Sequence, residues 1–172
     1  NLKSLIKFSK LKKSPISIDI ILSNNAKSKG LAFGKIYKIK KKIFNFDKKL
    51  LTEKKILNEL KKNKIKLICL AGFMKILSNE FIKNFNGKIL NIHPSLLPKY
   101  KGLNTHQRAI NNKEKFSGCT VHYVSAKLDS GKIIKQKIVK INKSDTPRLL
   151  KKKILVQEHK LYPEAILKIF NL

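Results

Sequence analysis

The sequence predicts an α/β fold in which a mostly parallel central sheet is flanked by helices. Segments with strand-like and helix-like hydrophobic patterns alternate along the chain, which is typical of this class. Residues 67–71 and 89–92 are mostly apolar runs of the kind found in strands that are buried on both faces of a sheet. A length of 172 residues leaves room for one domain with a hydrophobic core. We therefore expect residues 1–172 to form a single domain.

The first third of the chain predicts a helix and two strands. Over residues 1–13, Leu2, Leu5 and Ile6 lie on one face of an amphipathic helix, and Pro15 ends it. Residues 16–22 predict a strand, and the polar residues 23–25 predict the turn after it. A short edge strand is expected over residues 34–39.

The middle of the chain predicts short helices between buried strands. Thr52 suits the N-cap of a helix that reaches about residue 63. Residues 67–71 form the most apolar run, which predicts a central strand. Ser78 or Asn79 begins a short helix through Phe85, and Gly87 turns into the strand after it.

The last third predicts one more helix, two strands and a closing helix. The short helix is expected over residues 105–111, and the strands over residues 117–125 and 132–141. Ser144 or Asp145 should cap the closing helix, with Pro147 in its first turn, where proline is tolerated. That helix should bend near Pro163. Its inward-facing residues are expected to be Leu149, Leu150, Ile154 and Leu161.

The chain is strongly basic, because 40 Lys and Arg residues against 10 Asp and Glu residues give a net charge of +30. Such a charge alone favours a nucleic-acid or anionic-membrane partner. The excess is almost all lysine, however, and it is spread evenly instead of being clustered with arginine and aromatic residues. Compositional drift is therefore the simpler interpretation, and neither a nucleic acid nor a membrane is an expected partner.

Two cysteines, Cys69 and Cys119, lie in apolar segments without the spacing of a metal or redox motif. They predict reduced core residues of a cytoplasmic protein. No apolar stretch reaches the roughly 18 residues of a membrane span, and no signal-peptide pattern opens the chain. We expect a cytoplasmic location and no bound metal.

The best candidate for a site is the strand over residues 89–93 and the loop after it. Asn91 and His93 are the only polar residues near the strand's carboxyl end, and a spacing of two places them on the same face. Ligands of α/β sheets bind at that end. Pro94 and Pro98 restrict the following loop, so it should hold a ligand or a catalytic group in place.

Residues 91–102 resemble the signature of the folate-dependent formyltransferases. Five further segments are similar to the branch of this family that formylates glycinamide ribonucleotide in purine synthesis, and they occur in the same order: LAGFMKIL (70–77), GLNTHQRA (102–109), GCTVH (118–122), LDSGKII (128–134) and QEHKLYP (157–163). The resemblance implies a Rossmann-like formyltransferase fold and 10-formyltetrahydrofolate as co-substrate. It also implies that Asn1 directly follows the family's Gly-rich phosphate loop. We therefore expect an N-terminally truncated domain that binds the ribonucleotide poorly.

The resemblance implies that Asn91, His93 and Asp129 carry catalysis. Asn91 suits hydrogen-bond donation to a developing oxyanion, and His93 suits a general acid. A carboxylate at Asp129 would stabilise the protonated imidazole and orient it. The alternatives are a satisfied core histidine and a turn-capping aspartate. His122 is left open, because a histidine in a buried strand is more often structural.

The same resemblance implies residues for both substrates. Folate contacts are expected at Lys49, Met74, Lys75, Ile76, Leu77, Asn91, Ser125, Ala126, Lys127, Leu128 and Asp129. Ribonucleotide contacts are expected at Asn1, Gln157 and Glu158, although Glu158 could equally be an ordinary carboxylate on a helix surface. A basic nucleic-acid-binding module and methionyl-tRNA formyltransferase remain as alternative functions. We expect a monomer or a weak homodimer.

Overall fold

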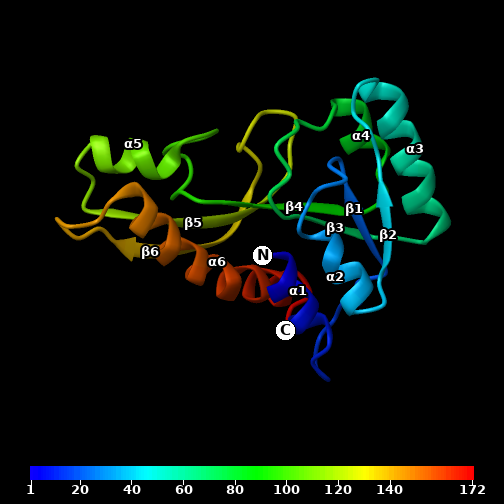
Figure 1. Cartoon of the computed structure of the whole chain (residues 1–172), viewed down its shortest axis with the longest axis horizontal. Coiled ribbons are helices and arrows are strands. Elements are labelled where there is room, and N and C mark those ends of the chain that lie inside the picture. The colour runs from blue at the N-terminus through cyan, green and yellow to red at the C-terminus, as the bar shows by residue number, and fades with distance from the viewer.

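A computed structural model describes residues 1–172 and contains six helices and six strands. In chain order they are α1 (Leu2–Ser9), β1 (Ile20–Ser23), α2 (Leu31–Ile36), β2 (Lys40–Ile43), α3 (Lys49–Lys62), β3 (Leu67–Leu70), α4 (Asn79–Asn84), β4 (Lys88–His93), α5 (Thr105–Asn111), β5 (Phe116–Tyr123), β6 (Ile133–Lys140) and α6 (Pro147–Ile169). Figure 1 shows the strands running through an elongated molecule with helices around them. The predicted α/β fold class is confirmed.

The strands form two hydrogen-bonded groups. β1 and β2 pair in parallel, and the other four strands form a sheet in the order β3-β4-β5-β6. Within this sheet β3 and β4 are parallel, whereas β4–β5 and β5–β6 are antiparallel. The strand directions are therefore mixed, not mostly parallel. The connection between β5 and β6 is too short for a crossover, so these neighbours have to run in opposite directions.

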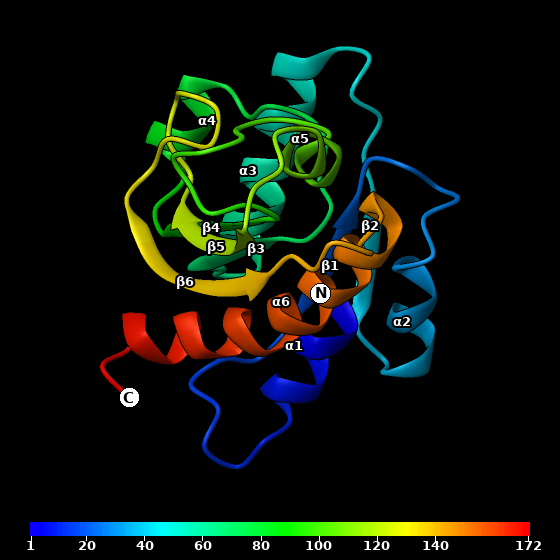
Figure 2. The same cartoon turned by 90° about the vertical axis from the view of Figure 1, so that its left-hand side faces the viewer.

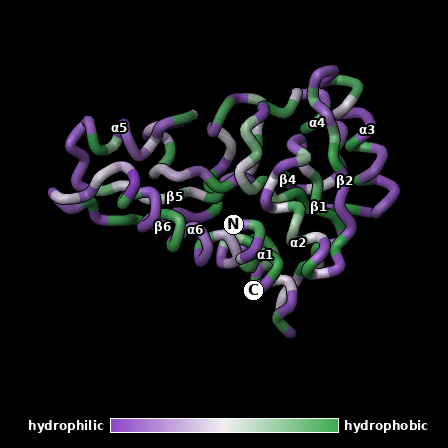
Figure 3. Tube along the Cα trace, in the orientation of Figure 1, coloured by the Kyte–Doolittle hydropathy of each residue, from purple (hydrophilic) through white to green (hydrophobic).

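Apolar layers cover both faces of the four-stranded sheet. On one face, α1 and α6 pack against β4 and β5 in a cluster of 14 buried residues. On the other face, α3 and α4 pack against β4 in a cluster of six. Figure 2 shows α6 along one side of the sheet, with α3 and α4 on the opposite side. Hydrophilic residues occupy the outer turns of α3 and α5 (Figure 3).

A buried tyrosine ties the closing helix to the sheet. Tyr162 of α6 is fully buried, and its hydroxyl lies 3.1 Å from the carbonyl oxygens of both Leu70 and Leu90. These carbonyls belong to β3 and β4. The contact therefore holds α6 against the two parallel strands just before the carboxyl end of β4.

Several predicted elements match the structure closely. Helix α5 has the predicted bounds, and α4 begins after Ser78, whose hydroxyl accepts a hydrogen bond from the Phe81 N–H at 3.0 Å. β5 and β6 agree with the predicted strands to within about two residues. Leu150, Ile154 and Leu161 are fully buried in α6, as predicted.

The strand predicted over residues 34–39 is wrong. These residues end helix α2 and lead into β2, which begins at Lys40. Leu31 and Gly34 are buried one helical turn apart, and the rings of Phe33 and Tyr37 lie 6.2 Å apart as helix neighbours. The prediction failed because six residues are too few to separate the two periodicities.

Other predicted boundaries are also wrong. Helix α1 ends at Ser9, well before residue 13, and β1 covers only the second half of residues 16–22. Helix α3 begins before Thr52, whose hydroxyl instead donates to the carbonyl oxygen of Asn45 at 2.5 Å. Strand β3 lies at the edge of the four-stranded sheet and not at its centre. Local patterns do not report which strands become neighbours.

The start of α6 also differs from the prediction. Thr146 is the N-cap, because its hydroxyl accepts from the Leu149 N–H at 3.2 Å. Asp145 instead accepts from the Asn142 N–H and pairs with Lys153. Leu149 is 45% exposed, since the helical period that buries the other three leaves it at the side.

Acidic residues join elements across the lysine-rich surface. Glu59 of α3 forms ion pairs with Lys40 and Lys42 of β2, and it accepts a hydrogen bond from the Asn63 amide. The Lys40, Lys42 and Asn63 contacts together lower the pKa of Glu59 to about 2.

None of the helices is both long enough and apolar enough to cross a membrane.

Replacing Glu59 should destabilise the fold near neutral pH and matter less in acid. Its folded-state pKa of about 2 lies below the ordinary value of 4.5, so its contribution is complete above pH 4.5 and is lost as the pH falls through about 2. Urea unfolding of wild type and Glu59→Gln from pH 7 to pH 2 should therefore show a stability gap that closes. The control is Glu80→Gln, which removes an exposed carboxylate without an ion-pair partner. A gap that stays constant with pH would contradict this role.

Candidate active site

The end of β4 and the second half of β5 present polar side chains on one face of the sheet. The antiparallel register places Asn91 opposite His122 and His93 opposite Thr120. Residues directly opposite in paired strands point to the same face. The apolar residues between them point to the other face and belong to the core under α6. The alternating side chains of β4 and β5 therefore place polar residues on one face of the sheet and buried apolar residues on the other.

His93 makes two contacts with oxygen atoms. Its Nε2 lies 2.8 Å from the carbonyl oxygen of Tyr100, and its Nδ1 lies 3.3 Å from Asp129 Oδ2. The side chains of His93 and Asp129 are each only 7% exposed. Because a carbonyl and a carboxylate only accept hydrogen bonds, both ring nitrogens are placed as donors. The surroundings of His93 therefore suit the doubly protonated ring.

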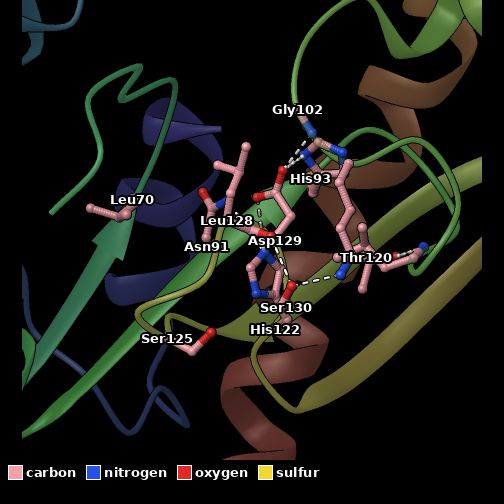
Figure 4. A network of polar contacts seen from close by, with 12 residues as sticks. Leu70, Asn91, His93, Gly102, Thr120, His122, Ser125, Leu128, Asp129 and Ser130 are labelled. Atoms are coloured by element: carbon pink, nitrogen blue, oxygen red, sulfur yellow. Dashed lines mark hydrogen bonds and ion pairs between the residues drawn. The ribbon is translucent and has the colours of Figure 1, made fainter. Parts of the chain in front are cut away.

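Asp129 is held in an unusual backbone conformation. Its φ of 44° is in the left-handed region, which costs energy for a residue other than glycine. Its Oδ2 accepts a hydrogen bond from the Gly102 N–H at 2.8 Å in addition to the His93 contact. Figure 4 shows the carboxylate between His93 and His122, with Gly102 beside it. The turn before β6 is thus fixed to the end of the loop over residues 94–102, which we call the proline loop.

A hydrogen-bond network fixes the proline loop to the sheet. The buried Thr120 hydroxyl donates to the carbonyl oxygen of Ser95 at 2.6 Å and accepts from the Leu97 N–H at 3.1 Å. Gln136 of β6 donates to the same hydroxyl and to the Leu97 carbonyl, both at 2.9 Å. The Ser95 hydroxyl donates to the carbonyl oxygen of Lys99 at 2.6 Å. These bonds set the position of the Tyr100 carbonyl that faces His93.

His122 belongs to the same polar cluster as Asn91, His93 and Asp129. It is 2% exposed, and its Nε2 lies 3.3 Å from Asn91 Nδ2 and 3.7 Å from Asp129 Oδ1. Its Nδ1 lies 2.8 Å from the carbonyl oxygen of Tyr123. Burial is the main cause that lowers the pKa of His122 below its ordinary value, against smaller opposing effects of Tyr123 and Asp129.

The residues expected to bind folate differ in their exposure. Met74 is 73% exposed, Ile76 is 56% exposed and Leu128 is 50% exposed, whereas Leu77 is buried in the core under α3 and α4. Lys49 is exposed at the first residue of α3. No hydrogen bond or ion pair joins Lys49 or residues 74–76 to the cluster.

Asn1 and Glu158 meet although they lie at opposite ends of the sequence. The Asn1 amide nitrogen donates to Glu158 Oε2 at 2.6 Å, and Glu158 is only 7% exposed. The alternative of an ordinary surface carboxylate is therefore wrong. The Asn1 amide oxygen is buried without a hydrogen-bond partner. Gln157 is partly buried next to Glu158.

Sequence reasoning missed three groups that hold the cluster together. They are the Tyr100 carbonyl, the Gly102 N–H and the Thr120 hydroxyl. Thr120 could have been found, because its spacing of two from His122 places both on one face. The backbone groups gave no sequence signal. Gly131 lets the chain pass close to β5, because a Cβ there would lie 1.7 Å from the Tyr123 carbonyl oxygen.

A pocket of about 620 Å³ lies between residues 96–100 and residues 112–117. Tyr100, Lys113 and Phe116 are among its lining residues, but Asn91, His93 and Asp129 are not. The pocket and the cluster therefore do not share a cavity. No group of three or more His, Cys, Asp or Glu side chains is placed to hold a metal ion.

The chain is similar to proteins of a known family. Residues 1–166 match the family described as formyl transferase. The chain belongs to the formyl transferase family. Phosphoribosylglycinamide formyltransferase of Haemophilus influenzae is 42% identical over 155 residues, which cover 88% of this chain and 73% of that protein.

A solved structure and a longer relative agree with this assignment. The crystal structure of phosphoribosylglycinamide formyltransferase from Brucella melitensis has a TM-score of 0.92 and 41% identity, over 98% of this chain and 88% of that chain. The human trifunctional purine biosynthetic protein adenosine-3 is 38% identical over 169 residues, which cover 96% of this formyl transferase chain. The chain spans only 17% of the length of that protein.

Removing the Thr120 hydroxyl should loosen the proline loop of this formyl transferase. Thr120→Val keeps the shape of the side chain but leaves the Ser95 carbonyl, the Leu97 N–H and one N–H of the Gln136 amide without a partner. We expect a loss of about 1–3 kcal/mol in unfolding free energy, and faster hydrogen exchange over residues 95–100. The control is Ser117→Ala, which removes from a buried residue of the same strand a hydroxyl that makes no hydrogen bond to the protein. Equal effects of the two substitutions would show that Thr120 does not hold the loop.

Proposed function

We propose that the chain transfers the formyl group of 10-formyltetrahydrofolate to the amine of glycinamide ribonucleotide in purine biosynthesis. The observation that carries the proposal is the convergence of Asn91, His93 and Asp129 at one end of the sheet. The names of relatives that are about 40% identical support this choice among the reactions of the family. On this reading the chain is an enzyme, a phosphoribosylglycinamide formyltransferase.

The transfer needs a group that stabilises negative charge on oxygen. Attack of the amine on the formyl carbon gives a tetrahedral intermediate whose oxygen carries the charge. The Asn91 amide is a neutral donor on the polar face of β4, and its nitrogen has two N–H groups, of which the His122 contact uses one. An oriented donor of this kind typically lowers the barrier by roughly 3–4 kcal/mol.

The transfer also moves a proton. The attacking amine loses one proton, and the folate nitrogen gains one as its bond to the formyl carbon breaks. We assign the donation to His93, whose two nitrogens already face acceptors. Asp129 stabilises the charged ring and orients it. The Nδ1–Oδ2 distance of 3.3 Å exceeds the roughly 2.7–2.9 Å of a charge-assisted hydrogen bond, so a substrate atom can compete for this N–H.

Two sets of residues are proposed to hold the substrates. For folate they are Lys49, Met74, Lys75, Ile76, Leu77, Ser125, Ala126, Lys127, Leu128, Asn91 and Asp129. For the ribonucleotide they are Asn1, Gln157 and Glu158. The unpartnered amide oxygen of Asn1, beside the buried Glu158, supports the second set, because both are acceptors for ribose hydroxyl or amine donors.

Small molecules are the proposed partners, and a nucleic acid is not. Lysines occur in every helix except α5 and in β2, β4 and β6 instead of forming one stripe, and the strongly positive field suits a pair of anionic substrates. Two free cysteines support a reducing, cytoplasmic environment. A monomer or a weak homodimer remains our proposal for the oligomeric state.

Replacing His93 should stop turnover without abolishing substrate binding. In His93→Ala the proton donor is lost, so kcat should fall by about 10²–10⁴-fold, while the dissociation constants of a folate analogue and of the ribonucleotide change little. The measurement is formyl transfer by purified protein, followed by the absorbance change of the folate, together with calorimetric titration. Thermal unfolding checks that the variant is folded.

Gln107→Ala is the control, because Gln107 on α5 is exposed, its side chain contacts only Asn111 and it is outside the proposed substrate sets. It should keep most of the wild-type kcat. Near-normal turnover by folded His93→Ala would exclude His93 as the acid. Absence of transfer by the wild-type chain at high concentrations of both substrates would refute the proposed reaction itself.

A further inference from the structure

His122 is a buried histidine that the proposed reaction does not use. It lies near the end of β5, is 2% exposed, and points to the same face as Asn91, which is its partner across the strands. A buried polar ring costs free energy unless its nitrogens are satisfied. Each of its two nitrogens has a polar neighbour, and these neighbours differ in kind.

The neighbours of the ring select one tautomer. The Tyr123 carbonyl oxygen, 2.8 Å from Nδ1, can only accept, so Nδ1 carries the proton. The neutral ring then has a bare acceptor at Nε2. Burial disfavours a second proton on this ring and lowers its pKa, while the facing groups Tyr123 and Asp129 oppose this and His93 adds to it. The two rings therefore differ in their neighbours: His122 Nε2 is left as an acceptor, whereas both nitrogens of His93 face acceptors.

The bare Nε2 faces one hydrogen-bond donor. It lies 3.3 Å from Asn91 Nδ2, and its other polar neighbour is the Asp129 carboxylate oxygen at 3.7 Å, which is an acceptor. If the Asn91 amide turned over, its oxygen would face both the Nε2 lone pair and the carboxylate. Three acceptors would then meet without a proton between them, which is unfavourable. The ring thus admits only the orientation that directs the amide nitrogen into the cluster.

We propose that neutral His122 is a positioning residue that holds the Asn91 carboxamide with its second N–H directed toward the substrate oxygen. This inference rests on the proposed formyl transfer and adds to it a residue that never touches the substrate. The role accounts for a histidine at position 122. An imidazole whose Nδ1 is hydrogen-bonded to the backbone holds its Nε2 as an acceptor in a fixed position beside the Asn91 amide. A leucine of similar size would fill the space but leave the amide free to rotate.

Three substitutions separate this role from simple packing. A glutamine at 122 can place its amide oxygen near the position of Nε2, an asparagine reaches only as far as Nδ1, and a leucine offers no acceptor. His122→Leu and His122→Asn should lower kcat by up to ~100-fold with little change in KM, since a misplaced donor costs that order of rate. His122→Gln should recover most of the loss. If His122→Gln and His122→Asn lose the same factor in kcat while both are folded, a hydrogen-bond acceptor at the Nε2 position is not required and the proposal is wrong.

A double-mutant cycle tests whether the effect passes through Asn91. In an Asn91→Ala background there is no amide to orient, so adding His122→Leu should change kcat less than about 2-fold. If His122→Leu costs the same factor in both backgrounds, His122 acts independently of Asn91 and the proposal is wrong. Should His122→Leu fail to fold, the same cycle with His122→Asn decides the question.

A measurement without substrate tests the contact between His122 and Asn91 independently of the proposed reaction. The imidazole ¹⁵N chemical shifts of His122 should report the tautomer protonated at Nδ1, and the Asn91 side-chain NH₂ signals should shift in His122→Asn but less in His122→Gln. A ring protonated at Nε2 would overturn the inference even if the enzyme is active. If the wild-type chain transfers no formyl group, the reaction is refuted, while the tautomer and the amide signals still decide the contact.

Discussion

The register between β4 and β5 is the constraint on which the site depends. It sets Asn91 opposite His122 and His93 opposite Thr120, so four polar side chains of two distant segments share one face. The residues between them are anchored in the core beneath α6, where several of them are fully buried. A slip by one residue would turn the polar row into that core and the apolar row toward the ligand. The hydrophobic core therefore maintains the geometry of the chemistry.

Two loops complete what the strands begin, and each is held by bonds that the chain supplies from elsewhere. The turn before β6 carries Asp129 in a left-handed conformation, and the Gly102 N–H and His93 compensate that strain by binding its carboxylate. The proline loop carries the Tyr100 carbonyl, and Thr120 fixes that loop from below. The two histidines then stand in contrasting surroundings: His93 faces two acceptors, and His122 faces an acceptor and a donor.

Most of the few acidic residues form contacts that stabilise the fold. With 10 carboxylates among 40 basic side chains, the acids are concentrated at contacts between elements. Glu59 joins α3 to β2, Asp145 joins the start of α6 to Lys153, and Glu158 meets Asn1. The lysines fill the remaining solvated surface, where a flexible cation costs little to place. The basic composition is thus compatible with an ordinary α/β fold and with anionic small-molecule substrates.

The sequence by itself determined the α/β class, the apolar runs of the main strands, the helix at residues 105–111 and the pairing of Asn91 with His93 on one face, because these follow from periodicity and from residue type. It also pointed to Asp129 through resemblance. Only the tertiary structure decided that β3 is an edge strand, that β4–β6 run antiparallel, and that His122, Thr120 and two backbone groups complete the cluster. The physical reason is that strand order and backbone hydrogen bonds join residues far apart in the chain, and no local pattern records which distant partner a segment will meet.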